Sequence, residues 1–184
     1  RRGSDALAVV EPDGRLRELG SFFTEVSQVV LGARPDQALI VAGSPLAEAA
    51  PHLVEIVEQD DDDPILASTQ LRPDRDLGLD AEWFSRPVHV TYESADGRTA
   101  HGLLYEPRNP DVTAPGDDRP PLVVMIHGGP TSAARHVLAL AKQFWTTRGF
   151  AVLDVDHGGS TGYGRPFRRL LEGRWGIVDV EDAV

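Results

Sequence analysis

The chain has 184 residues, 41% of them hydrophobic, no cysteine, and a formal net charge of −11 at pH 7. The absence of cysteine excludes a disulfide framework, a thiol nucleophile and thiolate metal ligands, and it suits a reducing cytoplasm, where we expect the protein to reside. The negative charge disfavours non-specific nucleic-acid binding, and no apolar run approaches the roughly 20 residues of a membrane span, so we expect no nucleic-acid or membrane partner.

Residues 1–70 contain short apolar or alternating segments separated by turn residues, with the strongest turn signal at Pro12-Asp13-Gly14. The strands expected here are 6–10, 15–19, 29–31, 38–42, 52–57 and 65–68. Strands of about five residues at regular spacing favour a β-sandwich or the blades of a β-propeller. The acidic run 60–63 lacks the ligand spacing and the glycine of a calcium loop, so we interpret it as a solvated hairpin tip.

The pattern changes after a connector at 71–87. Segments 88–93 and 99–105 flank Ala95-Asp96-Gly97, which predicts a β-hairpin. The following stretch, 107–121, is rich in proline, aspartate and glycine and is expected to be an exposed loop. Net charge also divides the chain, at −10 over residues 1–100 and −1 over residues 101–184. We therefore expect two differently built regions, with the boundary between residues 80 and 81.

Five consecutive apolar residues, 122–126, are typical of a strand buried on both faces of a parallel sheet. The strand ends at His127-Gly128-Gly129-Pro130. Two glycines allow a sharp turn that leaves backbone N–H groups uncovered, as a site for a developing oxyanion requires. A plain strand-to-helix turn explains the same four residues equally well.

A helix is expected next, capped by Thr131 or Ser132 and reaching about Arg148, where Gly149 suits its C-terminal end. Its expected apolar face comprises Val137, Leu140, Ala141, Phe144 and Trp145. A second buried strand at 151–156 then implies a right-handed parallel crossover. A glycine-rich loop at 157–164, a short helix at 166–171 and the start of a helix at 178–184 complete the chain.

Several segments in this order resemble the prolyl oligopeptidase family of serine peptidases, and most closely its acylaminoacyl-peptidase and dipeptidyl-peptidase-like members. The matching segments are 121–130, 144–156, 159–164 and 175–182. The resemblance is clear over residues 81–184 and faint before them. It implies an α/β fold class: the N-terminal half of an α/β-hydrolase domain (81–184, truncated before the nucleophile), preceded by antiparallel β-propeller blade strands and a connector (1–80).

The resemblance also assigns candidate site residues. The backbone N–H of Gly129, or less favourably Gly128, would be one oxyanion donor, and the other would come from the residue after a nucleophilic serine. His127 would shape this loop beside the substrate, because the catalytic histidine of this fold follows the serine and the acid in the chain. The loop at 157–164 would line the mouth of the site, with Tyr163 contacting the substrate or supporting its pocket. The family commonly has Asn-Tyr-Arg-Gly-Ser where this chain has Asp156-His157-Gly158-Gly159-Ser160, so no role of that arginine carries over.

Three further patterns invite a catalytic reading. Gly158 to Gly162 satisfies the pattern G-x-S-x-G, but no helix follows Ser160 directly and no histidine follows it, so we do not interpret Ser160 as a nucleophile. His157 is expected to be an exposed loop residue. Asp179, Glu181 and Asp182 fall in the first turn of a helix, where the dipole favours negative charge, and a structural use is expected. The spacing of the six histidines predicts no metal site, and we expect no cofactor.

The sequence therefore predicts part of a serine peptidase that hydrolyses short or N-terminally acylated peptides through an acyl-enzyme. This chain would carry the oxyanion loop without the Ser-Asp-His triad, would be inactive alone, and would leave a sheet edge that aggregates or needs a partner. The full-length protein could form oligomers. Two alternatives stay open: a carboxylesterase on the same fold, and a truncated, non-catalytic binding module.

Overall fold

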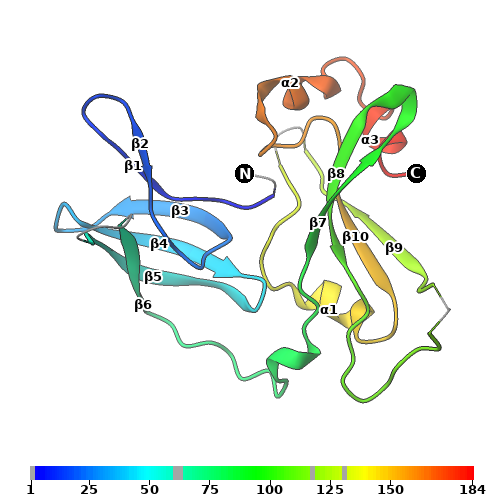
Figure 1. Cartoon of the computed structure of the whole chain (residues 1–184), viewed down its shortest axis with the longest axis horizontal. Helices are drawn as coiled ribbons and strands as arrows, with labels where there is room; N and C mark the ends of the chain where they lie inside the picture. Colours follow the sequence, from blue (N-terminus) through cyan, green and yellow to red (C-terminus); the bar gives the residue numbers. More distant parts are fainter. Residues whose placement is uncertain (1–2, 60–63, 117–118, 130–131) are drawn as a thin grey trace.

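The computed structural model describes residues 3–59, 64–116, 119–129 and 132–184, and it contains three β-sheets (Figure 1). A hairpin at the N-terminus pairs β1 (Ala8–Val10) with β2 (Leu16–Glu18). The four strands that follow form an antiparallel sheet in chain order: β3 (Glu25–Leu31), β4 (Gln37–Ser44), β5 (Ala47–Val57) and β6 (Ile65–Gln70). The acidic run at 60–63, predicted to be a hairpin tip, lies outside the described residues.

The sheet β3–β6 has its own apolar core, formed by Phe23, Ile40, Ala42, Val54 and Leu66. These positions alternate along β4 and β5, as expected for strands with one covered face. His52 is buried in this core with its ring edge against Phe23, and its Nδ1 lies 3.0 Å from the Ser68 hydroxyl. Four antiparallel strands in sequential order are the arrangement of a propeller blade.

The third sheet has the order β7-β8-β10-β9, with β7 (Val88–Glu93) and β8 (Thr99–Tyr105) forming the predicted hairpin. β10 (Ala151–Asp156) pairs antiparallel with β8 and parallel with β9 (Leu122–Ile126). Asp96 in the hairpin turn has φ 58° and the following Gly97 has φ 70°, which is the left-handed backbone that this turn sequence favours.

The prediction that β9 is buried on both faces is wrong for this chain. Leu122, Val124 and Ile126 are exposed, whereas Val123 and Met125 pack on the core around Leu103, Tyr105 and Val152. The physical reason is position: β9 is an edge strand with one neighbour, and no described element covers its second face.

The predicted helix from 131 or 132 to 148 is also wrong in its start and in its buried face. α1 spans only Leu140–Thr146, and the cap predicted at Thr131 lies outside the described residues. Residues 132–139 are instead held against the sheet β3–β6 and the N-terminal segment. The N–H of Leu138 donates to Ser44 O at 2.8 Å, Arg135 pairs with Glu25, and Ser4 Oγ lies 2.6 Å from His136 Nδ1. Within α1 the buried side chains are Lys142, Gln143 and Thr146, while Phe144 is exposed.

That reversal follows from polar partners that the hydrophobic pattern does not reveal. Lys142 pairs with buried Asp154 at 2.6 Å, and the Gln143 side chain accepts from the Ser85 N–H and donates to the Ser85 carbonyl. The chain ends with α2 (Gly164–Arg168), a 3-10 turn η3 (Arg169–Leu171) and α3 (Val178–Glu181), which lies beside the β7–β8 hairpin in Figure 1. Short 3-10 turns also occur at η1 (Ala81–Trp83) and η2 (Ala95–Gly97). No helix among the described residues is long and apolar enough to cross a membrane.

Candidate active site

The glycines predicted to supply an oxyanion donor lie just beyond the carboxyl end of β9 and are exposed. Gly129 has φ 83°, a left-handed conformation that favours glycine, and a Cβ added at Gly128 or Gly129 would meet no atom within 4 Å. No described residue accepts a hydrogen bond from the Gly129 N–H. The backbone here is therefore open to an incoming acceptor.

The side chain of His127 contacts the loop that follows β10. Its Nε2 lies 2.7 Å from the Ser160 hydroxyl, and its ring stacks on His157 with centroids 4.5 Å apart. Burial lowers the pKa of His127, and the neighbouring His157 adds to this effect. The neutral imidazole is thus favoured, which suits a group that fixes the conformation of a loop rather than one that carries charge.

Asp156, the last residue of β10, connects the two loops. Its Oδ1 accepts the Ala134 N–H at 2.6 Å, and its Oδ2 accepts the Tyr163 hydroxyl at 2.7 Å. Its Oδ1 also lies 3.9 Å from His127 Nε2. The side chain is fully buried, and burial raises the pKa of Asp156. Because its two oxygens accept hydrogen bonds from different segments, the Asp156 carboxylate joins the backbone at Ala134 to the loop at 157–164.

Tyr163 is partly buried, and its hydroxyl is already engaged. Besides donating to Asp156, the hydroxyl lies 3.1 Å from His89 Nε2, and the ring stacks on His101 with centroids 4.1 Å apart. Burial, reinforced by the Asp156 carboxylate, raises the pKa of Tyr163. Of the two predicted roles for Tyr163, this geometry favours support of the pocket over direct contact of its hydroxyl with a substrate.

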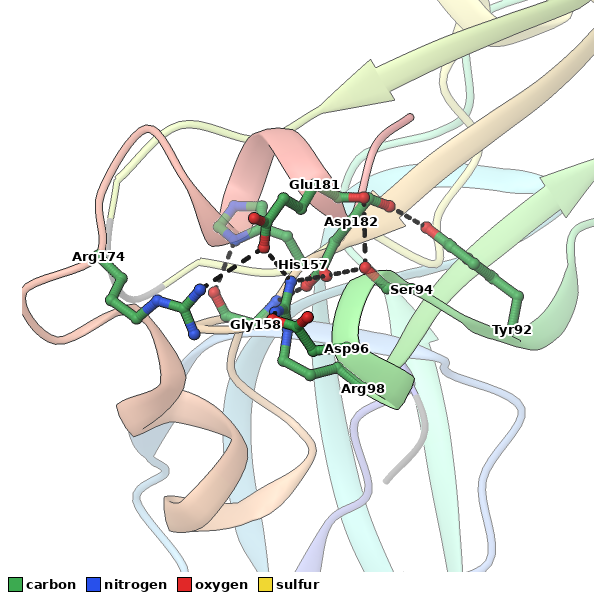
Figure 2. A network of polar contacts seen from close by, with 9 residues as sticks. All are labelled: Tyr92, Ser94, Asp96, Arg98, His157, Gly158, Arg174, Glu181 and Asp182. Atoms are coloured by element: carbon green, nitrogen blue, oxygen red, sulfur yellow. Dashed lines mark hydrogen bonds and ion pairs between the residues drawn. The ribbon is translucent and has the colours of Figure 1, made fainter.

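A second polar network fixes the start of the 157–164 loop (Figure 2). The carboxylate of Asp182, which directly follows α3, accepts the Gly158 N–H at 2.7 Å, the Ser94 hydroxyl, and Arg98 Nη2 at 3.1 Å. The backbone carbonyl of Asp182 accepts the Tyr92 hydroxyl at 2.6 Å, and burial raises the pKa of Tyr92 to about 12. Hence α3, the β7–β8 hairpin and the loop are joined through one buried residue.

The packing around Gly158 leaves little room for a side chain. A Cβ added at Gly158 would lie 2.7 Å from Val178 Cγ1 and 3.0 Å from Leu170 Cβ, so a larger residue here would require these neighbours to move.

Two sequence expectations about this loop have different outcomes. The prediction that His157 is exposed is wrong: it is 2% exposed, because the loop folds back over the end of β10 and stacks it on His127. Ser160, which we did not interpret as a nucleophile, is fully buried and cannot meet a substrate carbonyl. No three His, Cys, Asp or Glu side chains among the described residues are arranged to hold a metal ion.

Sequence reasoning missed the contacts of Asp156, Ser160 and Asp182. One signal was present: the carboxyl ends of adjacent parallel strands meet at one sheet edge, which places His127 after β9 near Asp156 at the end of β10. Nothing local indicated that Asp182 would reach Gly158, because 24 residues separate them.

Known proteins are similar to this chain in both sequence and structure. Residues 136–184 match the model of the prolyl oligopeptidase family. Dipeptidyl aminopeptidase BIII of Pseudoxanthomonas mexicana is 37% identical over 91 residues, which are 48% of this chain and 13% of that protein. The acylamino-acid-releasing enzyme of Rattus norvegicus is 40% identical over 104 residues, which are 54% of this chain and 14% of that protein.

The solved structures match nearly the whole chain. A puromycin hydrolase superposes with a TM-score of 0.84 and 36% identity, covering 99% of this chain and 26% of that one. A puromycin-hydrolyzing peptidase of Mycobacterium tuberculosis superposes with a TM-score of 0.84 and 33% identity. The match covers 99% of this chain and 27% of that one. The chain thus spans about a quarter of these structures and a smaller share of the curated relatives. The superpositions confirm the predicted fold class, propeller blade strands followed by the first part of an α/β-hydrolase domain.

Proposed function

We propose that this chain is part of a member of the prolyl oligopeptidase family and that the complete protein is a cytoplasmic serine peptidase that cleaves short peptides through an acyl-enzyme. The relatives named as acylamino-acid-releasing, dipeptidyl and puromycin-hydrolysing enzymes point to short substrates with a free or acylated N-terminus. In this proposal residues 1–80 are the end of the propeller with its connector, and residues 81–184 begin the hydrolase domain.

The observation that carries the proposal is the open backbone at Gly129. A tetrahedral intermediate places negative charge on the former carbonyl oxygen, and preorganised N–H donors at that position lower the barrier. The exposed, left-handed Gly129 offers such a donor beside a loop that Asp156 and Ser160 hold in place. We assign Gly129, with Gly128 as the second choice, to one half of the oxyanion hole.

The nucleophile, acid and base lie outside this chain in the proposal. The one serine–histidine pair at the site, Ser160 with His127, has a fully buried hydroxyl, so it serves to hold the loop. An oxyanion donor without a nucleophile leaves only binding and electrostatic effects, and we expect the 184-residue chain alone to hydrolyse nothing at a measurable rate.

The test compares Gly129→Ala with Gly116→Ala in the complete protein, using an aminoacyl anilide and a short-chain ester. A Cβ at Gly129 strains a left-handed backbone, so we expect kcat for the anilide to fall by about a hundredfold, the scale on which loss of one oxyanion donor acts. Gly116 lies in the exposed proline-rich loop with open space around it and should leave kcat unchanged.

A fluorophosphonate probe supplies the second arm. We expect it to label one serine of the complete protein, to label that same serine in the Ser160→Ala variant, and to leave the 184-residue chain unlabelled. Ester turnover without detectable anilide turnover would favour the carboxylesterase alternative. An unlabelled, inactive complete protein would leave the non-catalytic binding module as the better reading.

A further inference from the structure

A cleft of about 670 Å³ lies between the sheet β3–β6 and the segment that leads into α1. Its walls come from the start of β5, the connector after β6, residues 132–139, and the facing part of α1 and β10. His127, the first residue of the oxyanion loop, lines the same cleft. Its volume falls within the range of roughly 300–1,000 Å³ that is usual for small-molecule and peptide sites.

The charge of this cleft is opposite to that of the chain. Four cationic and two anionic side chains line it, a balance of +2, whereas the chain as a whole carries −11. The six residues are Arg72, Arg75, Arg135, Lys142, Glu48 and Asp154. A positive cleft in an acidic molecule concentrates negatively charged ligand groups.

Three of the four cations already have a carboxylate partner. Arg75 binds Glu48 through two hydrogen bonds of 2.9 and 2.6 Å, and Lys142 pairs with Asp154 at 2.6 Å. Arg135 pairs with Glu25, which lies outside the lining. Arg72 differs, because among the described residues its guanidinium contacts only the Ala49 carbonyl, at 3.2 Å.

The backbone that carries Arg72 is held in place before any ligand arrives. The N–H of Leu71 donates to Pro51 O at 2.9 Å, and Gln70 Nε2 donates to the Arg72 carbonyl and to Asp74 Oδ1, both at 2.7 Å. One Nη2 donor is used by Ala49, which leaves the rest of the planar fork for a bidentate acceptor.

We propose that Arg72 is a specificity residue that binds the C-terminal carboxylate of a short peptide lying in this cleft, with the peptide's scissile carbonyl near the oxyanion loop. This inference rests on the proposed peptidase function and names a substrate class for it, peptides with a free C-terminal carboxylate close to the cleaved bond. A carboxylate matches the fork geometry of arginine, and a C-terminal amide presents no charge to it.

The test measures binding in the complete protein by calorimetry, with a tripeptide whose scissile amide is replaced by a ketomethylene group, so that nothing is hydrolysed. The free-acid form is compared with its C-terminal amide. We expect the acid to bind about tenfold more tightly, the scale of one charge-assisted bidentate contact. Arg72→Gln should remove the difference, and Arg72→Lys should restore part of it because the charge returns without the fork.

Arg34→Gln is the matched control, because it removes one positive charge from a surface ion pair with Asp36 and Glu55 outside the cleft. It should keep the acid preference. In steady-state kinetics with a hydrolysable tripeptide, Arg72→Gln should raise KM about tenfold for the acid form alone and leave kcat unchanged, which a merely structural role would not do.

Equal affinity of acid and amide for the native protein, no detectable binding of the acid, or an acid preference that survives Arg72→Gln would each overturn the inference. A peptidase that turns over acid and amide peptides alike would keep the proposed function and reject this site. A protein without peptidase activity that still prefers the acid would reject the proposed function and keep the site.

Discussion

Asp182 illustrates how a single residue can join elements that are remote in sequence. Its carboxylate is 1% exposed and receives three donors, from Gly158, Ser94 and Arg98. A buried charge is tolerated only when it is paired and hydrogen-bonded, and these three contacts meet that condition (Figure 2). The start of the loop that holds His127 therefore depends on a residue that follows α3.

Replacement of Asp182 by alanine should destabilise the chain by about 3–5 kcal/mol, because it leaves the Gly158 N–H without an acceptor and removes one of the three carboxylates that pair with Arg98. Urea unfolding followed by circular dichroism measures this loss.

Asp179 on α3 supplies the control for that substitution. Its Oδ1 is buried with no partner among the described residues, so Asp179→Ala removes an unsatisfied group and should be neutral or slightly stabilising. Equal losses for the two variants would show that the Asp182 contacts contribute nothing specific.

At the scale of elements, β9 has two unequal faces. Val123 and Met125 pack on the core, whereas Leu122, Val124 and Ile126 are 40 to 52% exposed along a strand with a free edge. A flat, apolar edge strand is a template for pairing with another chain. In the relatives, of which this chain spans about a quarter, more chain is available to cover such a surface.

The isolated chain is therefore expected to self-associate through β9, and Val124→Lys should shift it toward monomer. The lysine projects into solvent from the exposed face, where charge opposes edge pairing. Size-exclusion chromatography with light scattering measures the change.

Val123→Lys is the matched control, since the strand alternates and this side chain points into the core. It should unfold the sheet β7-β8-β10-β9 rather than shift the chain toward monomer. A native chain that is monodisperse at high concentration would contradict the role assigned to β9.

Element positions were largely predictable from the sequence. Each of the ten strands in the described ranges overlaps a predicted segment, and the structure contains the hairpin predicted around Ala95-Asp96-Gly97. The helix before β10 was not predictable in its bounds. The apolar spacing of Val137 and Leu140 is helical, but Val137 belongs to an extended segment held by hydrogen bonds to Ser44 and Ser4.

At the scale of the whole molecule, buried histidines give the fold a common response to acid. Burial lowers the pKa of His52, His101, His127 and His136 below the ordinary value of 6.5. Between that value and the lower folded pKa the unfolded chain binds more protons than the folded one, so stability falls as pH falls through this window. Asp156 acts oppositely, because its raised pKa lets the folded state take up its proton first.

Because four histidines reduce stability on acidification and only Asp156 opposes them, we expect a net loss of stability. The urea midpoint of the dilute chain should therefore fall as the pH is lowered from about 7.5 to 5.5. His52→Gln, which removes one titrating ring from the core of β3–β6, should make the midpoint less dependent on pH. A midpoint that stays constant or rises toward pH 5.5 would show that these imidazoles protonate without cost in the folded state.

The sequence by itself determined what depends on a few neighbouring residues: the strands, the hairpin turn, and the glycine turn that ends β9 at His127-Gly128-Gly129, because turn chemistry and alternation act locally. Only the tertiary structure decided which faces are buried, where α1 begins, and which side chains meet at the site. These depend on partners far along the chain, such as Ser160 for His127 and Asp182 for Gly158. A buried polar group is stable only opposite its partner, and that pairing is set by the packing of whole elements rather than by local sequence.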